Sequence, residues 1–206
     1  MGFAIVGENH FLASGHPNGA RDLPPHLGLI ESTDAGRTWE SVSRIGKSDF
    51  HVLRSGDRRT YGWSTTSGRL EVTTDRSRWS DRGEMALVDL AVDPQDDRNL
   101  LAAVATSDTE VVVRESHDGG KNWIDLDAPE SLVRLDWPSD GQAWGVASNG
   151  LVYTRDGDDW TRQGRLAAAA EAITSDRDSW YAAADEAIHR SDDGGETWEI
   201  VVEYDD

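Results

Sequence analysis

Four polar side chains in two nearby segments of this sequence have the chemistry to bind or transform a ligand. They are, in chain order, His16, His26, Asp49 and His51. Imidazole and carboxylate groups together form two-histidine-plus-carboxylate metal sites, and they also act as acid–base pairs on small polar ligands. We therefore predict a binding site at these residues, in which His16 and His51 are the candidate ligands of a divalent metal.

Two carboxylates further along the chain, Asp89 and Glu171, are candidates for catalysis. Hydrolysis of a glycosidic bond needs two carboxyl groups, about 5 Å apart for retention or roughly 6.5–9.5 Å apart for inversion. The chain holds 39 acidic residues, so a pair of carboxylates does not by itself indicate an enzyme. The meaning of these residues depends on the elements that position them.

A motif of the form Ser-x-Asp-x-Gly-x-Thr/Asn-Trp organises the whole chain. Complete copies span Ser32–Trp39, Ser116–Trp123 and Ser191–Trp198, and shortened copies span Thr73–Trp79 and Thr154–Trp160. The motif aspartates are separated by 41, 43, 38 and 37 residues. A period in this range is typical of repeat architectures.

Each copy of the motif is suited to a tight turn between two strands. Asp, Ser and Thr side chains bond to backbone groups a few residues on, and Gly supplies the positive φ of such a turn. Short apolar segments flank every copy, so we predict a β-hairpin turn with its Trp packed beneath it. The predicted structural residues are Asp34, Trp39, Asp75, Trp79, Asp118, Trp123, Asp156, Trp160, Asp193 and Trp198.

Two further strand-like segments precede each motif copy, so each repeat contains four short strands. Four antiparallel strands per repeat are typical of a β-propeller blade. We predict an all-β chain with one propeller domain, residues 1–206, whose five blades span 1–43, 49–83, 86–126, 131–164 and 168–202. Residues 165–172 have high helix propensity, but the repeat period demands a strand by Ala172.

The motif resembles the Asp box, or BNR repeat, of sialidases, sortilin-like receptors and glycosyl-hydrolase-like propellers, over essentially the whole chain. In those proteins the box is a folding device that lies away from the active site. The resemblance therefore implies a structural role for the motif aspartates rather than a calcium or sugar site. Related propellers are often longer by about one blade at the N-terminus, so a six-bladed fold lacking its N-terminal blade is an alternative.

The resemblance also raises the question of glycosidase activity. A sialidase needs three arginines that grip the substrate carboxylate, a Tyr–Glu nucleophile pair and an acidic proton donor. The Arg-Ile-Pro motif of those enzymes is absent, because Arg44-Ile45 is followed by Gly46, and Arg134 is the only arginine that we place on a first strand. We therefore predict that the chain is not a classical sialidase, and we favour binding over catalysis.

A site is expected on the face of the blades opposite the motif turns. The connection between the second and third strands of blade 1, residues 14–27, is long, and function concentrates in long loops on rigid scaffolds. Alternation places Asp49 and His51 on one side of the strand that follows. Aligned across the blades, His51, Asp89 and Glu171 lie at comparable depth, where they form a site or line a water-filled polar channel.

Composition and charge restrict the class of protein. The formal net charge is −19, which disfavours binding to nucleic acids and to anionic membranes. The chain has no cysteine, which excludes disulfides and thiolate metal sites, and no apolar run reaches the length of a membrane span. No signal peptide precedes the first strand-like segment, so we expect a cytoplasmic protein, or an extracytoplasmic one if the N-terminus is truncated.

Two functions are compatible with these features. The first is a scaffold that binds a small molecule, a carbohydrate or a protein on the face bearing loop 14–27. The second is a glycosyl-hydrolase-like enzyme that acts on a carbohydrate in the same cleft. No cofactor is expected, although a divalent metal at that face is compatible with both functions. The first and last sheets leave edges through which the chain could oligomerise.

Overall fold

The computed structural model describes residues 1–19, 22–139, 141–176 and 178–204. Regular structure in these ranges is entirely β, so none of the described residues forms a helix that could span a membrane. The strands are β1 (Phe3–Gly7), β2 (His10–Ala13), β3 (Leu29–Ser32), β4 (Glu40–Ser43), β5 (Phe50–Ser55), β6 (Thr60–Ser64), β7 (Arg69–Thr73), β8 (Ser80–Glu84), β9 (Leu87–Val92), β10 (Leu100–Ala105), β11 (Val111–Ser116), β12 (Ile124–Leu126), β13 (Leu132–Asp136), β14 (Trp144–Ala147), β15 (Leu151–Asp156), β16 (Asp159–Arg165), β17 (Ala172–Asp176), β18 (Ser179–Ala184), β19 (Ala187–Ser191) and β20 (Glu199–Glu203).

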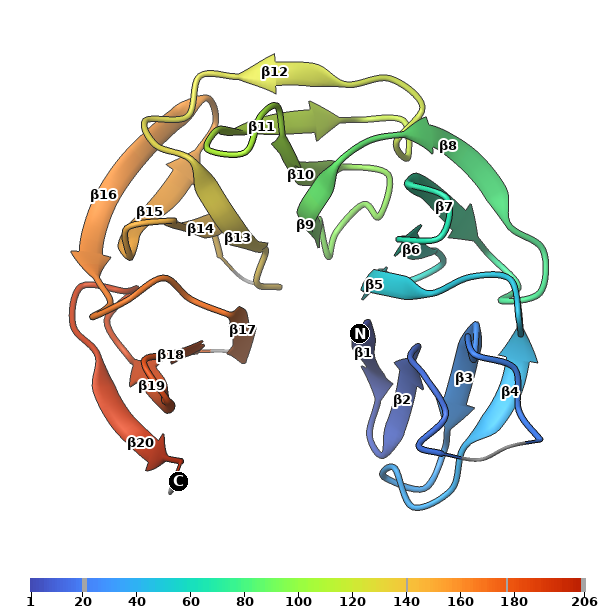
Figure 1. The fold of residues 1–206 in the computed structure, drawn as a ribbon. Coiled ribbons are helices and arrows are strands. Elements are labelled where there is room, and N and C mark those ends of the chain that lie inside the picture. The colour runs from blue at the N-terminus through green and yellow to red at the C-terminus, as the bar shows by residue number, and fades with distance from the viewer. Residues whose placement is uncertain (20–21, 140, 177, 205–206) are drawn as a thin grey trace. The chain divides into compact units, whose positions relative to one another are not determined.

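The strands form five antiparallel sheets, each made of four strands that are consecutive in the chain (Figure 1). We number these sheets as blades 1 to 5 in chain order. The blades are grouped into two compact units. The first unit comprises Met1–Leu87 and Asp118–Lys121 and holds blades 1 and 2, and the second comprises Val88–His117 and Asn122–Asp206. The four-stranded repeat predicted from the motif spacing is confirmed.

The core of the first unit forms between blades 1 and 2. The fully buried side chains of the cluster between these blades are Leu12, Leu29, Phe50 and Leu53. The Phe50 ring stacks on Trp79 with ring centroids 4.7 Å apart. A Cβ at Gly62 on β6 would lie 2.6 Å from the Phe50 ring, so this position needs a glycine. The packing holds β5, and with it the residues just before β5, in a fixed position.

Tryptophans dominate one part of the core of the second unit. Trp144 is fully buried and stacks on Trp180, with ring centroids 4.3 Å apart and planes 12° from parallel. Trp198, from the last motif copy, lies 6.2 Å from Trp144. Because aromatic side chains bury large areas, this cluster stabilises the packing of blade 4 against blade 5.

The complete motif copies form turns that are held by their own side chains. In the first copy, Ser32 Oγ donates to Asp34 Oδ1 at 2.9 Å and accepts the Gly36 amide at 2.8 Å. The Asp34 carboxylate accepts the amide and the hydroxyl of Thr38 at 2.8 and 2.6 Å. Trp39 Nε1 donates to the Gly36 carbonyl at 3.1 Å. The last copy makes the same bonds, as expected for a structural turn.

The shortened copies differ from one another. Asp75 keeps the carboxylate–backbone bond, because its Oδ1 accepts the Arg78 amide at 2.8 Å. Asp156 instead ends β15 and pairs with Asp159 at the start of β16, so that a two-residue turn closes this hairpin. Gly157 supplies the positive φ, 59°, that such a turn requires. The fourth repeat therefore replaces the motif turn with a tighter one.

The motif tryptophans differ in burial. Trp39 is 38% exposed although its indole bonds to its own turn. The other motif tryptophans are half-buried, and they are Trp79, Trp123, Trp160 and Trp198. Packing of the indole beneath the turn is therefore deeper in the later copies than in the first.

Motif turns of the first unit also contact the fourth strand of the preceding blade. Ser43 Oγ, at the end of β4, donates to the Arg76 carbonyl in the blade 2 turn at 2.6 Å. Arg82 Nε on β8 donates to the Gly119 carbonyl at 2.7 Å, within the segment Asp118–Lys121 that belongs to this unit. Asp118 Oδ1 accepts the Lys121 amide at 3.0 Å and so shapes that turn. The motif therefore connects blades as well as strands.

The helix-prone segment between β16 and β17 forms no helix. β16 ends at Arg165 and β17 begins at Ala172, which pairs with Ala183 of β18. The prediction that the repeat period imposes a strand by Ala172 is confirmed. Pairing with a neighbouring strand outweighs the local helix propensity of the alanines.

Candidate functional site

Three connections meet at one end of blades 1 and 2, and we call this surface the loop face. They are residues 14–28 between β2 and β3, residues 44–49 between β4 and β5, and residues 65–68 between β6 and β7. Successive strands of an antiparallel sheet reverse direction, so the loop face lies opposite the motif turns. Ala20 and Arg21, in the loop predicted at residues 14–27, lie outside the described residues.

Hydrogen bonds from side-chain and backbone atoms fix the first connection to its neighbours. Ser14 Oγ accepts the Phe50 amide at 3.0 Å, which ties the start of this loop to blade 2. Near its end, the His26 carbonyl accepts the Gly46 amide at 2.8 Å. Both ends of the long loop are therefore held against the segment that leads into β5.

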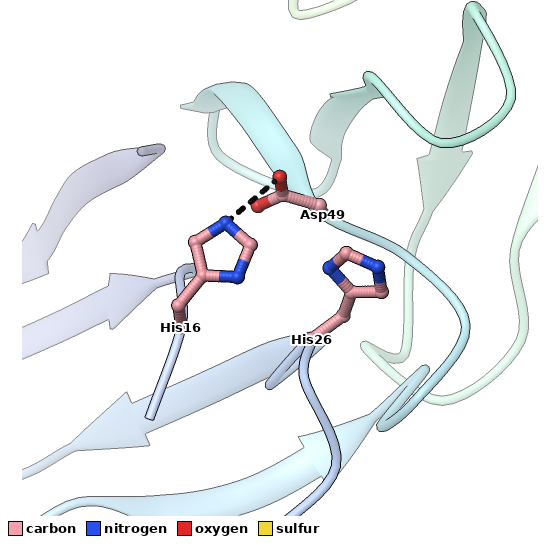
Figure 2. Close-up of side chains that lie close together, drawn as sticks. All are labelled: His16, His26 and Asp49. Atoms are coloured by element: carbon pink, nitrogen blue, oxygen red, sulfur yellow. Dashed lines mark ion pairs between the residues drawn. The ribbon is translucent and has the colours of Figure 1, made fainter. Parts of the chain in front are cut away.

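His16, His26 and Asp49 come together on the loop face (Figure 2). One ligand atom from each residue lies within 4.8 Å of the others, and the two imidazole rings have centroids 5.3 Å apart. Figure 2 shows the Asp49 carboxylate facing the His16 ring, with the His26 ring beside them. His16 is exposed, His26 is half-buried, and Asp49 is 4% exposed. The cluster thus has a buried anion beneath two accessible imidazoles.

The two carboxylate oxygens of Asp49 have different surroundings. Oδ2 lies 3.0 Å from His51 Nε2, 3.3 Å from His16 Nε2 and 3.1 Å from the Thr65 hydroxyl that donates to it. Oδ1 is buried and has no hydrogen-bond partner. Burial raises the pKa of Asp49, but the Thr65 hydrogen bond and the charges of His51 and His16 outweigh it, so the pKa lies below its usual value. Asp49 is therefore an anion at neutral pH.

The hydrogen bonds of the two clustered histidines determine which ring atoms are free. His16 Nδ1 lies 2.7 Å from the Pro25 carbonyl, which can only accept, so Nδ1 carries the proton. In a neutral His16 ring, Nε2 is then a bare acceptor that faces the Asp49 carboxylate. His26 Nδ1 is buried without a hydrogen-bond partner, an arrangement that costs about 1–3 kcal/mol when nothing compensates it.

His51, the other predicted metal ligand, has a different position. Its side chain is 44% exposed, and it lies at an irregularity of the β5–β6 pairing between Phe50 and Val52. Its Nε2 lies 3.0 Å from Asp49 Oδ2. The cluster of ligand atoms within 4.8 Å of one another nevertheless consists of His16, His26 and Asp49, without His51. His51 therefore contacts the cluster through the Asp49 carboxylate.

Asp89 and Glu171 belong to the second unit. Asp89 is 3% exposed, and its carboxylate accepts the amides of Leu90 at 2.9 Å and of Leu135 at 3.1 Å. These bonds tie β9 to β13. The Glu171 side chain is exposed, and its backbone carbonyl accepts Arg134 Nε at 2.7 Å. A catalytic role for Asp89 and Glu171 stays a prediction.

Thr65 is a site residue that the sequence analysis did not single out. Its amide donates to the Asp49 carbonyl at 3.0 Å, because β5 and β6 pair in antiparallel register up to that point. Thr65 directly follows the last paired residue of β6. Its contact with Asp49 can be recognised only when the register between β5 and β6 is known. The register was not available from the sequence alone.

A groove of the first unit is lined by residues of the β4–β5 connection and of the blade 2 motif turn. It has a volume of about 270 Å³ and is lined by Arg44, Ile45, Lys47, Ser77 and Trp79. Arg44 forms an ion pair with Glu71. Burial raises the pKa of the Glu71 carboxyl. The groove therefore offers basic, apolar and aromatic groups within one surface.

A second groove, in the second unit, was not predicted. It is lined in part by Glu115, His117, Trp137 and Arg155, and its volume is about 460 Å³. Arg155 is 7% exposed and donates to both oxygens of Glu115, at 2.6 and 3.2 Å. The charged groups of Arg155 and Glu115 are thus engaged with each other. We therefore regard this ion pair as a structural feature of blades 3 and 4.

Solved structures with the same arrangement of strands include proteins of different functions. One is YCF48 bound to D1 peptide, which is 18% identical over 97% of this chain and 65% of that chain, with a TM-score of 0.62. Another is the GH74 xyloglucanase from Xanthomonas campestris, 17% identical over 100% and 32% of the two chains, with a TM-score of 0.67. A chain of a nidogen/laminin complex is 14% identical over 92% and 74%, with a TM-score of 0.69.

These likenesses concern the fold. The chain spans about two-thirds of the length of the first of these proteins and one-third of the second. The sequence matches no curated protein. The profile of the BNR/Asp-box repeat matches residues 189–199, which include the last motif turn. The chain therefore has the fold of a β-propeller with five four-stranded blades, and its last motif turn matches the BNR/Asp-box repeat.

Proposed function

We propose that this propeller is a binding module that takes up a segment of a partner protein on its loop face. The observation that carries the proposal is the position of the two described parts of the long loop, residues 14–19 and 22–28, whose histidines are held against Asp49 of the next blade. A loop that is ordered before binding loses less conformational entropy when it binds. Such a loop, present in blade 1 and not repeated, is suited to recognition.

The side chains around the cluster support a protein partner. Leu23 and Ile45 are 47% and 42% exposed, and Ile45 lines the groove of the first unit together with Arg44 and Trp79. Exposed apolar side chains beside arginine and tryptophan are typical of protein interfaces. YCF48, a protein of similar fold, is bound to a peptide, and another similar chain comes from a nidogen/laminin complex.

The charges of the site favour binding over glycoside hydrolysis. A hydrolase needs a carboxylic acid whose pKa is raised so that it can donate a proton near neutral pH. The pKa of Asp49 is lowered instead. Glu71, whose pKa is raised, is engaged by Arg44 on its own part of the sheet. Neither carboxyl is prepared to act as a general acid.

A peptide-display selection tests the proposal. Peptides selected against the immobilised protein should bind the wild type and lose at least about tenfold in affinity, roughly 1.4 kcal/mol, to the Ile45→Asp variant. Asp158→Lys, at an exposed turn on the motif side of blade 4, is the matched control and should leave binding unchanged. Biolayer interferometry with the same peptides measures each affinity.

Two results would overturn the proposal. The first is that no peptide is enriched, or that the enriched peptides bind the Ile45→Asp variant as well as the wild type. The second is release of soluble sugars from xyloglucan by the wild type that is lost in Asp49→Asn, which would instead indicate an enzyme.

A further inference from the structure

We infer that His16, His26 and Asp49 form a binding site for a divalent transition-metal ion, with Zn²⁺ as its representative. The inference goes beyond the proposed function and does not depend on it, since it concerns what holds the loop rather than what the loop face binds. It also changes the expected ligand set, because His26 takes the place that the sequence analysis gave to His51.

Two buried atoms of the cluster that could bind a metal have no hydrogen-bond partner. Asp49 is 4% exposed, yet its Oδ1 has no hydrogen-bond partner, and neither has the buried His26 Nδ1. Buried polar atoms of folded proteins are almost always paired. Two unpaired atoms within one group of metal-binding residues point to a ligand shared by both residues.

The orientation of the His16 ring also favours a bound cation. Its Nδ1 donates to the Pro25 carbonyl, so in a neutral ring the lone pair of Nε2 lies only 3.3 Å from Asp49 Oδ2. Two acceptors repel each other at this distance unless a cation lies between them or the ring is protonated. A backbone carbonyl that fixes the far nitrogen is the usual second contact of a metal-binding histidine.

The spacing of the three ligand atoms is close to that of a Zn²⁺ site. Zn²⁺ binds histidine nitrogen at about 2.0–2.1 Å and carboxylate oxygen at about 2.0–2.2 Å. Two ligand atoms bound to one tetrahedral Zn²⁺ are then roughly 3.4 Å apart. The ligand atoms of His16, His26 and Asp49 lie within 4.8 Å of one another, which is somewhat wider. The exposed His16 ring can close this difference by rotation of its side chain.

The donor set also indicates the class of ion. Two imidazoles and one carboxylate suit Zn²⁺ and other first-row transition ions, whereas Ca²⁺ and Mg²⁺ prefer oxygen ligands throughout. Three protein ligands leave a fourth position for water or for a donor from a partner. The ion would connect the blade 1 loop to Asp49 at the start of blade 2.

Metal titration of untagged protein tests the inference. The protein is stripped with a chelator, dialysed and titrated with Zn²⁺ by calorimetry. We expect one ion per chain, no competition from Mg²⁺ or Ca²⁺, and visible absorption bands when Co²⁺ replaces Zn²⁺. Zn²⁺ should also raise the melting temperature, because an ion that binds only the folded state stabilises it.

Variants separate the ligands from their neighbours. His26→Ala and Asp49→Asn should lose the one-to-one binding and the rise in melting temperature. His51→Ala should keep the stoichiometry and lose about 10–100-fold in affinity, because His51 contacts the site only through Asp49. His117→Ala, an exposed histidine of the second unit, is the control and should bind as the wild type does.

Circular dichroism of each metal-free variant shows whether it is folded, and His26→Ala changes a half-buried loop residue that the sheets do not need. The inference is wrong if the wild type binds no stoichiometric Zn²⁺. It is also wrong if folded His26→Ala binds Zn²⁺ as tightly as the wild type does.

Discussion

The motif aspartates act through the hydrogen bonds that their carboxylates accept. In Asp193 the hydroxyl of Thr197, then its amide, lower the pKa from the usual 3.8 to about 2. The hydroxyl and amide of Thr38 lower the pKa of Asp34 to about 2 in the same way. A carboxylate whose charged form accepts several hydrogen bonds holds its turn only while it is ionised.

Acid should therefore weaken the turns within a narrow pH range. A folded-state pKa below the unfolded value means that the stabilisation is complete above about pH 4 and is lost as pH falls toward about 2. We expect the melting temperature of the wild type to fall steeply over this range and that of Asp193→Ala to fall less. At neutral pH the variant should melt about 2–4 °C lower than the wild type.

Asp57→Ala is the control for this prediction, because Asp57 is an exposed turn residue, with its side chain 82% exposed. Differential scanning calorimetry at pH 7, 4, 3 and 2 gives the melting temperature as a function of pH for the wild type and both variants. Parallel curves for the wild type and Asp193→Ala between pH 4 and 2 would contradict the role of the Asp193 carboxylate.

At the scale of elements, the motif turn of one blade packs against the fourth strand of the blade before it. In the second unit, a Cβ added at Gly164 on β16 would lie 2.2 Å from the Gly195 carbonyl oxygen and 2.5 Å from that of Glu196. Both atoms are backbone, so they cannot move aside as a side chain would. Only glycine permits this approach.

Gly164→Ala should accordingly destabilise the protein. We expect a loss of about 3 kcal/mol in the free energy of unfolding, at the upper end of the cost of overpacking. Gly7→Ala on β1 is the matched control, because an added Cβ there comes no closer than 3.4 Å to a neighbouring atom. Urea unfolding followed by fluorescence measures the free energy of unfolding of both variants. Equal losses of stability in the two variants would show that crowding against Gly195 does not cause the destabilisation.

At the scale of the whole molecule, the formal net charge of −19 is the dominant long-range term. Like charges over a folded chain repel one another and destabilise the compact state. Salt shortens the range of this repulsion, since the Debye length falls from about 30 Å at 0.01 M to about 10 Å at 0.1 M. The stability of the protein should therefore depend on ionic strength.

We expect the melting temperature to rise by a few degrees between 0.01 and 0.5 M NaCl, with most of the rise below about 0.1 M. Sodium bromide at equal ionic strength should have nearly the same effect, because screening depends on ion charge and concentration. A flat response, or a rise that differs strongly between the two salts, would show that charge repulsion does not limit the stability.

The repeat was determined by the sequence alone. The spacing of the motif aspartates predicted four-stranded blades, and side chains within each turn make the bonds that the motif requires. These interactions are local, so residues a few positions apart in the chain are sufficient to specify them. At Ala172 the repeat period, rather than the local helix propensity, predicted the strand that β17 forms.

The composition of the cluster on the loop face was decided only by the tertiary structure. His16 and His26 are ten residues apart, and a loop without repeating pattern gives no rule for which of them meets Asp49. Alternation along β5 favoured His51, but an irregularity in the pairing with β6 leaves His51 at the edge of the site. Contacts between the blades fix these positions, and contacts of that range are not encoded in any local pattern.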